Sequence, residues 1–204
     1  MAKAMSKETF TSPSAESLAE AVRRAQRNNR GKGLPPVQDW TPDFSGDLDM
    51  RIARDGTWFY QGTPINRPEM VRLFSTILRR EGDGFFLVTP VEKWAITVDD
   101  APFVAVDVEA EGEGAEQELI FETNTGEKVV AGPDNPIRVE RHGDSEEPAP
   151  YVMVRDGLEA LIDRKSFYRM VERGAHEDGR FGLWSGGAFF PIIESRRMLA
   201  EMDS

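Results

Sequence analysis

One pattern of residues occurs twice in the chain, and it constrains the fold more than any other feature. The ten-residue blocks Ile65–Phe74 and Ile162–Val171 align without a gap as Ile, Asn or Asp, Arg, two variable positions, an apolar residue, a variable position, Arg and two apolar residues. Each block follows an Arg-Asp-Gly triplet and precedes an Asp-Gly pair. We interpret this as a duplicated unit of strand hairpin, helix and strand hairpin. Convergence is the alternative, because a capped helix between strands is common.

The repeat sets the expected domain organisation. The 204 residues suit one sizeable domain or two small ones. We expect an α+β fold with a polar basic leader over 1–32, partly disordered, and an N-terminal α+β repeat domain over 33–98. A β-rich domain that contains the second repeat follows over 99–194, and a charged tail over 195–204.

Helical spacing of apolar residues predicts three helices, Ala15–Gln26, Asn66–Glu81 and Asp163–Glu172. In the second, Asn66 and Glu69 have the spacing of a capping box. Two strands are expected within 47–60, around a turn at 54–56. The further predicted strands are 85–88, 94–98, 103–108, 118–123, 128–131, 137–141, 151–155 and 158–162, with a closing hairpin of 180–184 and 188–192. Residues 142–149 are expected to be an acidic loop.

Charge is distributed unevenly along the chain, whose formal net charge is −11. Residues 104–148 contain 13 acidic and 3 basic residues, whereas residues 1–33 contain 3 acidic and 7 basic residues. Duplex binding needs a basic face, so a long duplex nucleic acid is not an expected partner. The chain has no cysteine, no membrane-span-length apolar stretch and no apolar secretory leader, so we expect a cytoplasmic protein. The sequence identifies no cofactor.

Arginines of the two repeats are the main candidate ligand-binding residues. They form the matched pairs Arg54 with Arg155, Arg67 with Arg164 and Arg72 with Arg169, and Arg51 lies near the first. A guanidinium group presents five donors in a planar fork that suits phosphate or carboxylate. The alternative is that these arginines form salt bridges with Asp55, Asp156, Glu69 or Glu159.

Two other residues are weaker candidates. Lys93, at the end of a proline turn, could contact a phosphate, and Trp184, on a predicted strand, could stack on a base. The alternatives are a solvated turn for Lys93 and a place in the core for Trp184. Ser185–Gly187 lacks the lysine and the following helix of a phosphate-binding loop, and we expect a hairpin turn there.

Catalytic patterns are weak in this sequence. The two histidines, His142 and His176, have no metal-ligand partner four residues on. For a magnesium-dependent reaction at a phosphoester, the candidate ligands are Asp55, Asp99, Asp100 and Asp156.

Eight stretches of the chain resemble a known family. They are Gly33–Pro36, Asp49–Ile52, Arg54–Tyr60, Val88–Lys93, Asp100–Phe103, Gly132–Asp134, Tyr151–Ile162 and Trp184–Pro191. On these residues the chain resembles the proteobacterial domain-of-unknown-function family DUF1285 over roughly 33–192. The resemblance implies a duplicated core and a C-terminal domain superficially like the pleckstrin-homology fold. It also implies a ligand site at the domain interface, a nucleotide-like or nucleic-acid-derived ligand and a signalling role.

These observations lead to one hypothesis with two alternatives. We expect a cytoplasmic regulatory protein, not an enzyme, that binds a small anionic, nucleotide-like ligand between its two repeats. One alternative is a protein-interaction module with a protein partner and no small ligand. The other is the metal-dependent phosphoester enzyme.

Overall fold

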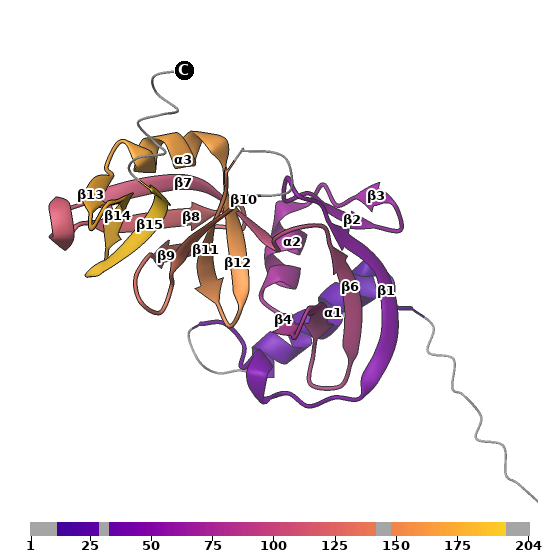
Figure 1. The fold of residues 1–204 in the computed structure, drawn as a ribbon. Helices are drawn as coiled ribbons and strands as arrows, with labels where there is room; N and C mark the ends of the chain where they lie inside the picture. The colour runs from indigo at the N-terminus through magenta and orange to yellow at the C-terminus, as the bar shows by residue number, and fades with distance from the viewer. Residues whose placement is uncertain (1–11, 29–32, 142–147, 195–204) are drawn as a thin grey trace, which may run out of the picture. The chain divides into compact units, whose positions relative to one another are not determined.

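The computed structural model describes residues 12–28, 33–141 and 148–194. The chain divides into two compact units, one of Met1–Arg51 with Trp58–Thr97 and one of Ile52–Thr57 with Val98–Ser204. The fold class is α+β, as predicted. The described residues contain three α-helices, two six-stranded sheets and one three-stranded sheet (Figure 1).

The first unit contains one six-stranded sheet and two α-helices. Its helices are α1 (Ala15–Asn28), a 3-10 turn η1 (Val37–Asp39) and α2 (Pro68–Ser75). Its strands are β1 (Phe44–Ile52), β2 (Trp58–Tyr60), β3 (Thr63–Pro64), β4 (Leu78–Glu81), β5 (Gly84–Val88) and β6 (Lys93–Val98), in the order β3-β2-β1-β6-β5-β4. The predicted first helix is confirmed, with Leu18 and Val22 buried. It packs against α2, so these residues of the leader belong to this unit's core.

The second unit contains the other two sheets. The larger has the order β10-β11-β12-β7-β8-β9, and the smaller the order β13-β14-β15. The strands are β7 (Phe103–Glu111), β8 (Glu118–Thr123), β9 (Lys128–Val130), β10 (Ile137–Arg141), β11 (Pro148–Arg155), β12 (Leu158–Ile162), β13 (Ala175–Glu177), β14 (Arg180–Ser185) and β15 (Ala188–Glu194). A 3-10 turn, η2 (Gly114–Glu116), precedes β8, and α3 (Arg164–Val171) follows β12. The larger sheet is mixed, because β12 pairs in parallel with β7.

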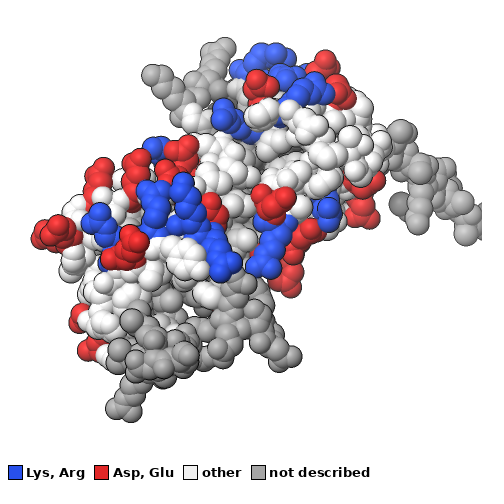
Figure 2. Space-filling view, turned by 90° about the horizontal axis from the view of Figure 1, so that it is seen from above, with Lys and Arg blue, Asp and Glu red and all other residues white. Residues whose placement is uncertain are grey.

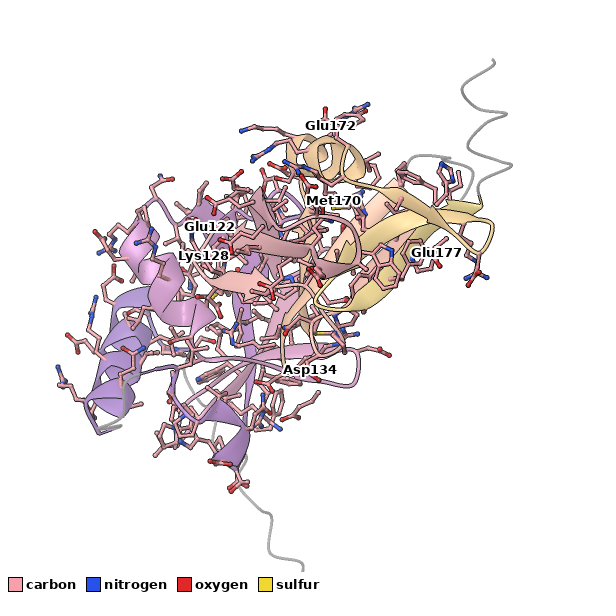
Figure 3. The ribbon with its side chains drawn as sticks, turned by 90° about the vertical axis from the view of Figure 1, so that its left-hand side faces the viewer. Glu122, Lys128, Asp134, Met170, Glu172 and Glu177 are labelled. Carbon is pink, nitrogen blue, oxygen red and sulfur yellow. The ribbon has the colours of Figure 1, made fainter. Side chains whose placement is uncertain are left out.

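Helix α3 covers β7 of the larger sheet. Met170 lies on the apolar face of this helix and is buried, whereas Glu172, just after the helix, is exposed. Figure 3 shows Met170 on the side of α3 nearer the strands and Glu172 on the outer side. Alternate residues of β8 and β12 are buried in the core, including Leu119, Phe121 and Leu158.

The predicted second helix is too long. It begins at Pro68 and ends at Ser75, and residues 78–81 form strand β4, paired with β5. Asn66 is not the cap, because Arg67 before the proline is extended (φ −111°, ψ 100°) and proline occupies the first helical turn. Ile77 and Leu78 are buried as the helical pattern required, but the burial comes from the sheet. A run of adjacent apolar residues fits both structures, and pairing with β5 decides between them.

The two Arg-Asp-Gly triplets form different turns. Asp156 and Gly157 are a two-residue loop between β11 and β12, with φ of +46° and +79°, as in a type I′ hairpin turn. The first triplet lies in a wider loop, closed by a backbone hydrogen bond from the Ala53 N–H to the Thr57 carbonyl at 2.9 Å. There the Asp55 carboxylate accepts a hydrogen bond from the Thr57 N–H at 2.9 Å. The sequence match therefore does not extend to one turn geometry.

The predicted acidic loop, residues 142–149, extends two residues too far at its C-terminal end. Pro148 and Ala149 already belong to β11 and pair with Arg141 and Glu140 of β10. The remainder of that prediction, 142–147, and the tail 195–204 lie outside the described residues. The predicted turn at Ser185–Gly187 is confirmed as the β14–β15 connection. Strands β3, β4 and β13 are not predicted from the sequence.

Asp163 caps α3, as the sequence predicts. Its carboxylate accepts a hydrogen bond from the Ser166 N–H at 2.7 Å, and its backbone is extended. We expect Asp163→Ala to lower the free energy of unfolding by about 1 kcal/mol, because a helix N–H loses its acceptor. Asp163→Asn keeps an acceptor and should stay close to the wild type. Urea unfolding measures both, and equal losses in the two variants would contradict a capping role.

No helix among the described residues is long and apolar enough to cross a membrane. Figure 2 views the molecule from the side of α3, where Lys and Arg side chains lie among Asp and Glu side chains rather than in one basic face.

Candidate functional site

A pocket of about 680 Å³ opens in the second unit where the start of β11, the end of β12 and the first turns of α3 meet. Its lining is mostly apolar and contains Pro148, Ala149, Pro150, Leu161, Ile162, Phe167 and Tyr168. Three charged residues complete it, Arg54, Asp163 and Arg164. Arg54 comes from the 52–57 loop, which belongs to this unit. The structure thus brings together two of the predicted arginines, which come from the two copies of the repeat but are not a matched pair.

Local sequence explains the shape of this pocket. β11 pairs with β10 from Pro148 onward but joins β12 only from Tyr151, which lies opposite Leu161. The chain then leaves β12 through the cap residue Asp163 and turns into α3. The space therefore lies between the unpaired side of residues 148–150 and the first turns of the helix.

Arg54 is held in place by an ion pair with the half-buried Asp100. Its Nε lies 3.1 Å from the Asp100 Oδ2, and the Tyr151 hydroxyl donates to the Asp100 Oδ1 at 2.8 Å. Burial, followed by the hydrogen bond to Asp100, raises the pKa of Tyr151 well above its usual range, so the hydroxyl stays a donor. Among the described residues, Asp100 contacts Arg54 at Nε, so the Nη donors can reach a ligand. The Arg54 side chain is 61% exposed and that of Asp100 18%.

Arg164 lies on the helix side of the pocket, next to an aromatic ring. Its Nε donates to the Tyr168 hydroxyl at 3.2 Å, and its guanidinium carbon lies 5.7 Å from the centre of that ring. Tyr168 is itself 55% exposed. An arginine and an accessible aromatic ring therefore lie side by side on the first two turns of α3.

The predicted residues of the first unit are not part of this pocket. Arg67 pairs with Glu16 of α1 at 2.5 Å, and this hydrogen bond lowers the pKa of the Glu16 carboxyl. Lys93 pairs with Glu81 at 3.1 Å. Arg51 lies 4.9 Å from the centre of the Phe59 ring, and Arg72 is exposed on α2.

Three predicted residues of the second unit also lie elsewhere. Arg155 is half-buried and donates to Glu127 at 2.9 Å, and Arg169 pairs with Asp107 and donates to the Val108 carbonyl at 2.6 Å. Trp184 is half-buried against Phe189, with ring centres 5.4 Å apart. The salt-bridge alternative thus describes Arg54, Arg67, Arg155 and Arg169, although with acidic partners other than the four predicted ones.

Sequence reasoning missed the apolar part of the site and its support. Pro148 and Pro150 fell in or next to a predicted loop, and Tyr151 was expected only as a strand residue. Behind Asp100, Arg138 stacks 4.2 Å from the Tyr151 ring centre and makes two hydrogen bonds to Glu159, at 2.7 and 2.8 Å. The aromatic pair Phe167-Tyr168 at the start of a helix was an available signal for an exposed ring.

The candidate magnesium ligands do not converge. Asp100 contacts Arg54 and Tyr151. Asp55 lies in the 52–57 loop, where it accepts from the Thr57 N–H, and Asp156 lies in the β11–β12 loop. Within residues 12–28, 33–141 and 148–194, no group of three His, Asp or Glu side chains could hold a metal ion.

Comparison with known proteins identifies the family of this chain. Residues 35–101 match the family described as domain of unknown function (DUF1285), N-terminal domain, and residues 102–192 match the C-terminal domain of the same family. The chain belongs to the DUF1285 family.

Two solved structures of DUF1285 proteins are similar to this chain. One, from Silicibacter pomeroyi, is 59% identical, covers 93% of this chain and all of its own, and has a TM-score of 0.85. The other, from Shewanella baltica, is 28% identical, covers 62% of this chain and 92% of its own, and has a TM-score of 0.50. No curated protein matches the chain. The two DUF1285 matches meet between residues 101 and 102.

Proposed function

We propose that this protein is a non-catalytic regulatory protein that binds a small anionic ligand in the pocket of its second unit. The observation that carries the proposal is the position of Arg54 and Arg164 at an apolar-lined pocket of about 680 Å³. That volume lies within the range usual for small-molecule sites, about 300–1,000 Å³. Few precisely placed charged groups on an apolar lining are also usual there.

The arrangement suits binding rather than chemistry. Arg54 is positioned by Asp100 and can donate further hydrogen bonds to an anion. Arg164 places a cation beside the aromatic ring of Tyr168. The carboxylates near the pocket are already engaged, since Asp163 caps α3 and Asp100 pairs with Arg54. A ligand site between the two repeats stays a prediction, and so does the nucleotide-like character of the ligand.

The proposed duplication has support in the order of the elements. Paired strands precede the helix in each unit, β1–β3 before α2 and β11–β12 before α3, and three strands follow each helix. The two sets of following strands differ in topology, because β4–β6 complete the sheet of β1–β3 and β13–β15 form a sheet of their own. We propose that both arose from one ancestral unit, and that the second unit resembles a pleckstrin-homology fold as the family resemblance implies.

A thermal-shift screen tests the proposed function. The panel contains mononucleotides, cyclic nucleotides, nucleotide-derived cofactors and simple carboxylates, and a ligand at about 100 times its Kd should add about 2.7 kcal/mol of stability. The shift should disappear in Arg54→Gln and in Arg164→Gln, and persist in Arg173→Gln, which removes an exposed arginine outside the pocket. Without ligand, we expect the substitutions to cost less than about 1 kcal/mol, because both arginines are exposed.

A shift that the Arg54 and Arg164 variants leave unchanged would contradict this site. If no anion raises the melting temperature, that result would also contradict the site and would favour the protein-interaction alternative.

A further inference from the structure

We infer that the pocket selects an amphipathic monoanion, a single carboxylate on an aromatic or branched apolar body, over a nucleotide phosphate. This inference rests on the proposed function and specifies the ligand class of the same site. Three observations carry it: the nature of the lining, the charge balance at the pocket and the way Arg54 is held.

The lining offers little that could recognise a nucleotide base. Seven of its ten residues are apolar or aromatic, and the other three are Arg54, Asp163 and Arg164. Two of the seven, Pro148 and Pro150, have no backbone N–H and therefore cannot donate to a ligand from the chain itself. A base edge buried against such a wall would leave polar atoms without partners, which costs free energy, whereas an aryl or alkyl body would not.

The charges at the pocket disfavour a ligand that carries several negative charges. Two guanidinium groups line the pocket, but Asp163 lines it as well, and Asp100 lies behind Arg54 at 3.1 Å. The formal sum of these four groups is zero. A di- or triphosphate would bring several negative charges close to two carboxylates, whereas one carboxylate requires only the two arginines.

The geometry of the arginines also fits one planar anion. Among the described residues, Asp100 contacts Arg54 at Nε rather than at the Nη edge, and Arg164 donates from Nε to the Tyr168 hydroxyl. A carboxylate is planar and accepts from a guanidinium edge through two parallel hydrogen bonds. The Phe167 and Tyr168 rings then lie where the apolar body would rest.

Isothermal titration calorimetry with three matched probes tests this inference on the full chain. The probes are naphthalene-2-carboxylate, the neutral naphthalene-2-methanol and AMP. We expect the carboxylate to bind at least about tenfold more tightly than the alcohol, because only the carboxylate meets the arginines. We expect AMP to bind more weakly than the carboxylate.

Variants of three residues locate the effect. Arg54→Gln and Arg164→Gln should each raise the Kd of the carboxylate about tenfold and leave the Kd of the alcohol unchanged. Arg173→Gln should change neither. Asp163→Asn keeps the helix cap but removes a negative charge, so it should improve AMP binding more than binding of the carboxylate.

The outcomes separate this inference from the proposed function. AMP binding that is tighter than that of the carboxylate and is lost in Arg54→Gln would overturn the ligand class and leave the anion site standing. Equal affinity for the carboxylate and the alcohol, or binding indifferent to both arginines, would overturn both.

Discussion

Replacing Arg155 with methionine is expected to lower the free energy of unfolding by about 2–3 kcal/mol. The Arg155 side chain is 16% exposed and that of Glu127 26%, and the two make a hydrogen bond of 2.9 Å. Arg155 also lies 5.1 Å from the centre of the Phe103 ring. Methionine is of similar length, so the loss comes from leaving a half-buried carboxylate without its partner.

The pH dependence of this loss identifies its cause. Burial raises the pKa of Glu127 above its ordinary value of 4.5 even with Arg155 present, and removal of the cation should raise it further. A carboxyl whose pKa is higher in the folded state stabilises the fold below its unfolded pKa and loses that contribution as pH rises through the folded pKa. The deficit of Arg155→Met relative to the wild type should therefore be small near pH 4.5 and full at pH 8.

A second substitution serves as the control. Adding Glu127→Gln to Arg155→Met removes the half-buried charge and should recover most of the lost stability. It should also remove the pH dependence of the difference. Urea unfolding followed by circular dichroism measures all three proteins. A deficit that is independent of pH and remains in the double variant would show that Arg155 acts through packing and not through its charge.

Gly182→Ala is expected to cost about 3 kcal/mol or more, because the added methyl group has no room. A Cβ at Gly182 of β14 would lie 2.4 Å from the Phe190 carbonyl oxygen and 2.9 Å from the Pro191 Cα. Both are backbone atoms of the neighbouring strand β15, so relief requires the β14–β15 ladder to open. A melting temperature of Gly182→Ala close to that of the wild type would show that the two strands accommodate the methyl group, and would contradict this prediction.

Gly132→Ala is the matched control for this prediction. Its Cβ would meet the Gly186 Cα at 3.8 Å, an ordinary van der Waals distance. We expect a change within about 1 kcal/mol in either direction, as for other substitutions away from special positions. Differential scanning calorimetry compares the two variants with the wild type.

The ligand site shows where sequence reasoning reached its limit. The sequence singled out six repeat arginines by their matched positions, and Arg54 and Arg164 do line one pocket. Matched position did not predict which arginines meet, because Arg67 pairs with Glu16 and Arg155 with Glu127. Those partners come from α1 and from the β8–β9 connection, neither of which belongs to the repeat.

Local patterns by themselves determined most of the regular structure. Alternating strands such as β8, β10 and β12 begin and end at the predicted residues, because turn residues bound them on both sides. The cap at Asp163 was equally local, since it depends on one side chain and an N–H three residues on.

Only the tertiary structure decided the features that depend on distant partners. Leu78 and Arg79 lie in a strand because their backbone pairs with β5, although their sequence also suits a helix. The parallel pairing of β12 with β7 joins segments more than fifty residues apart, and no local pattern encodes it. The pocket and the charge balance around Arg54 arise in the same way, because Arg54, Asp100 and Tyr151 meet only when their segments pack together.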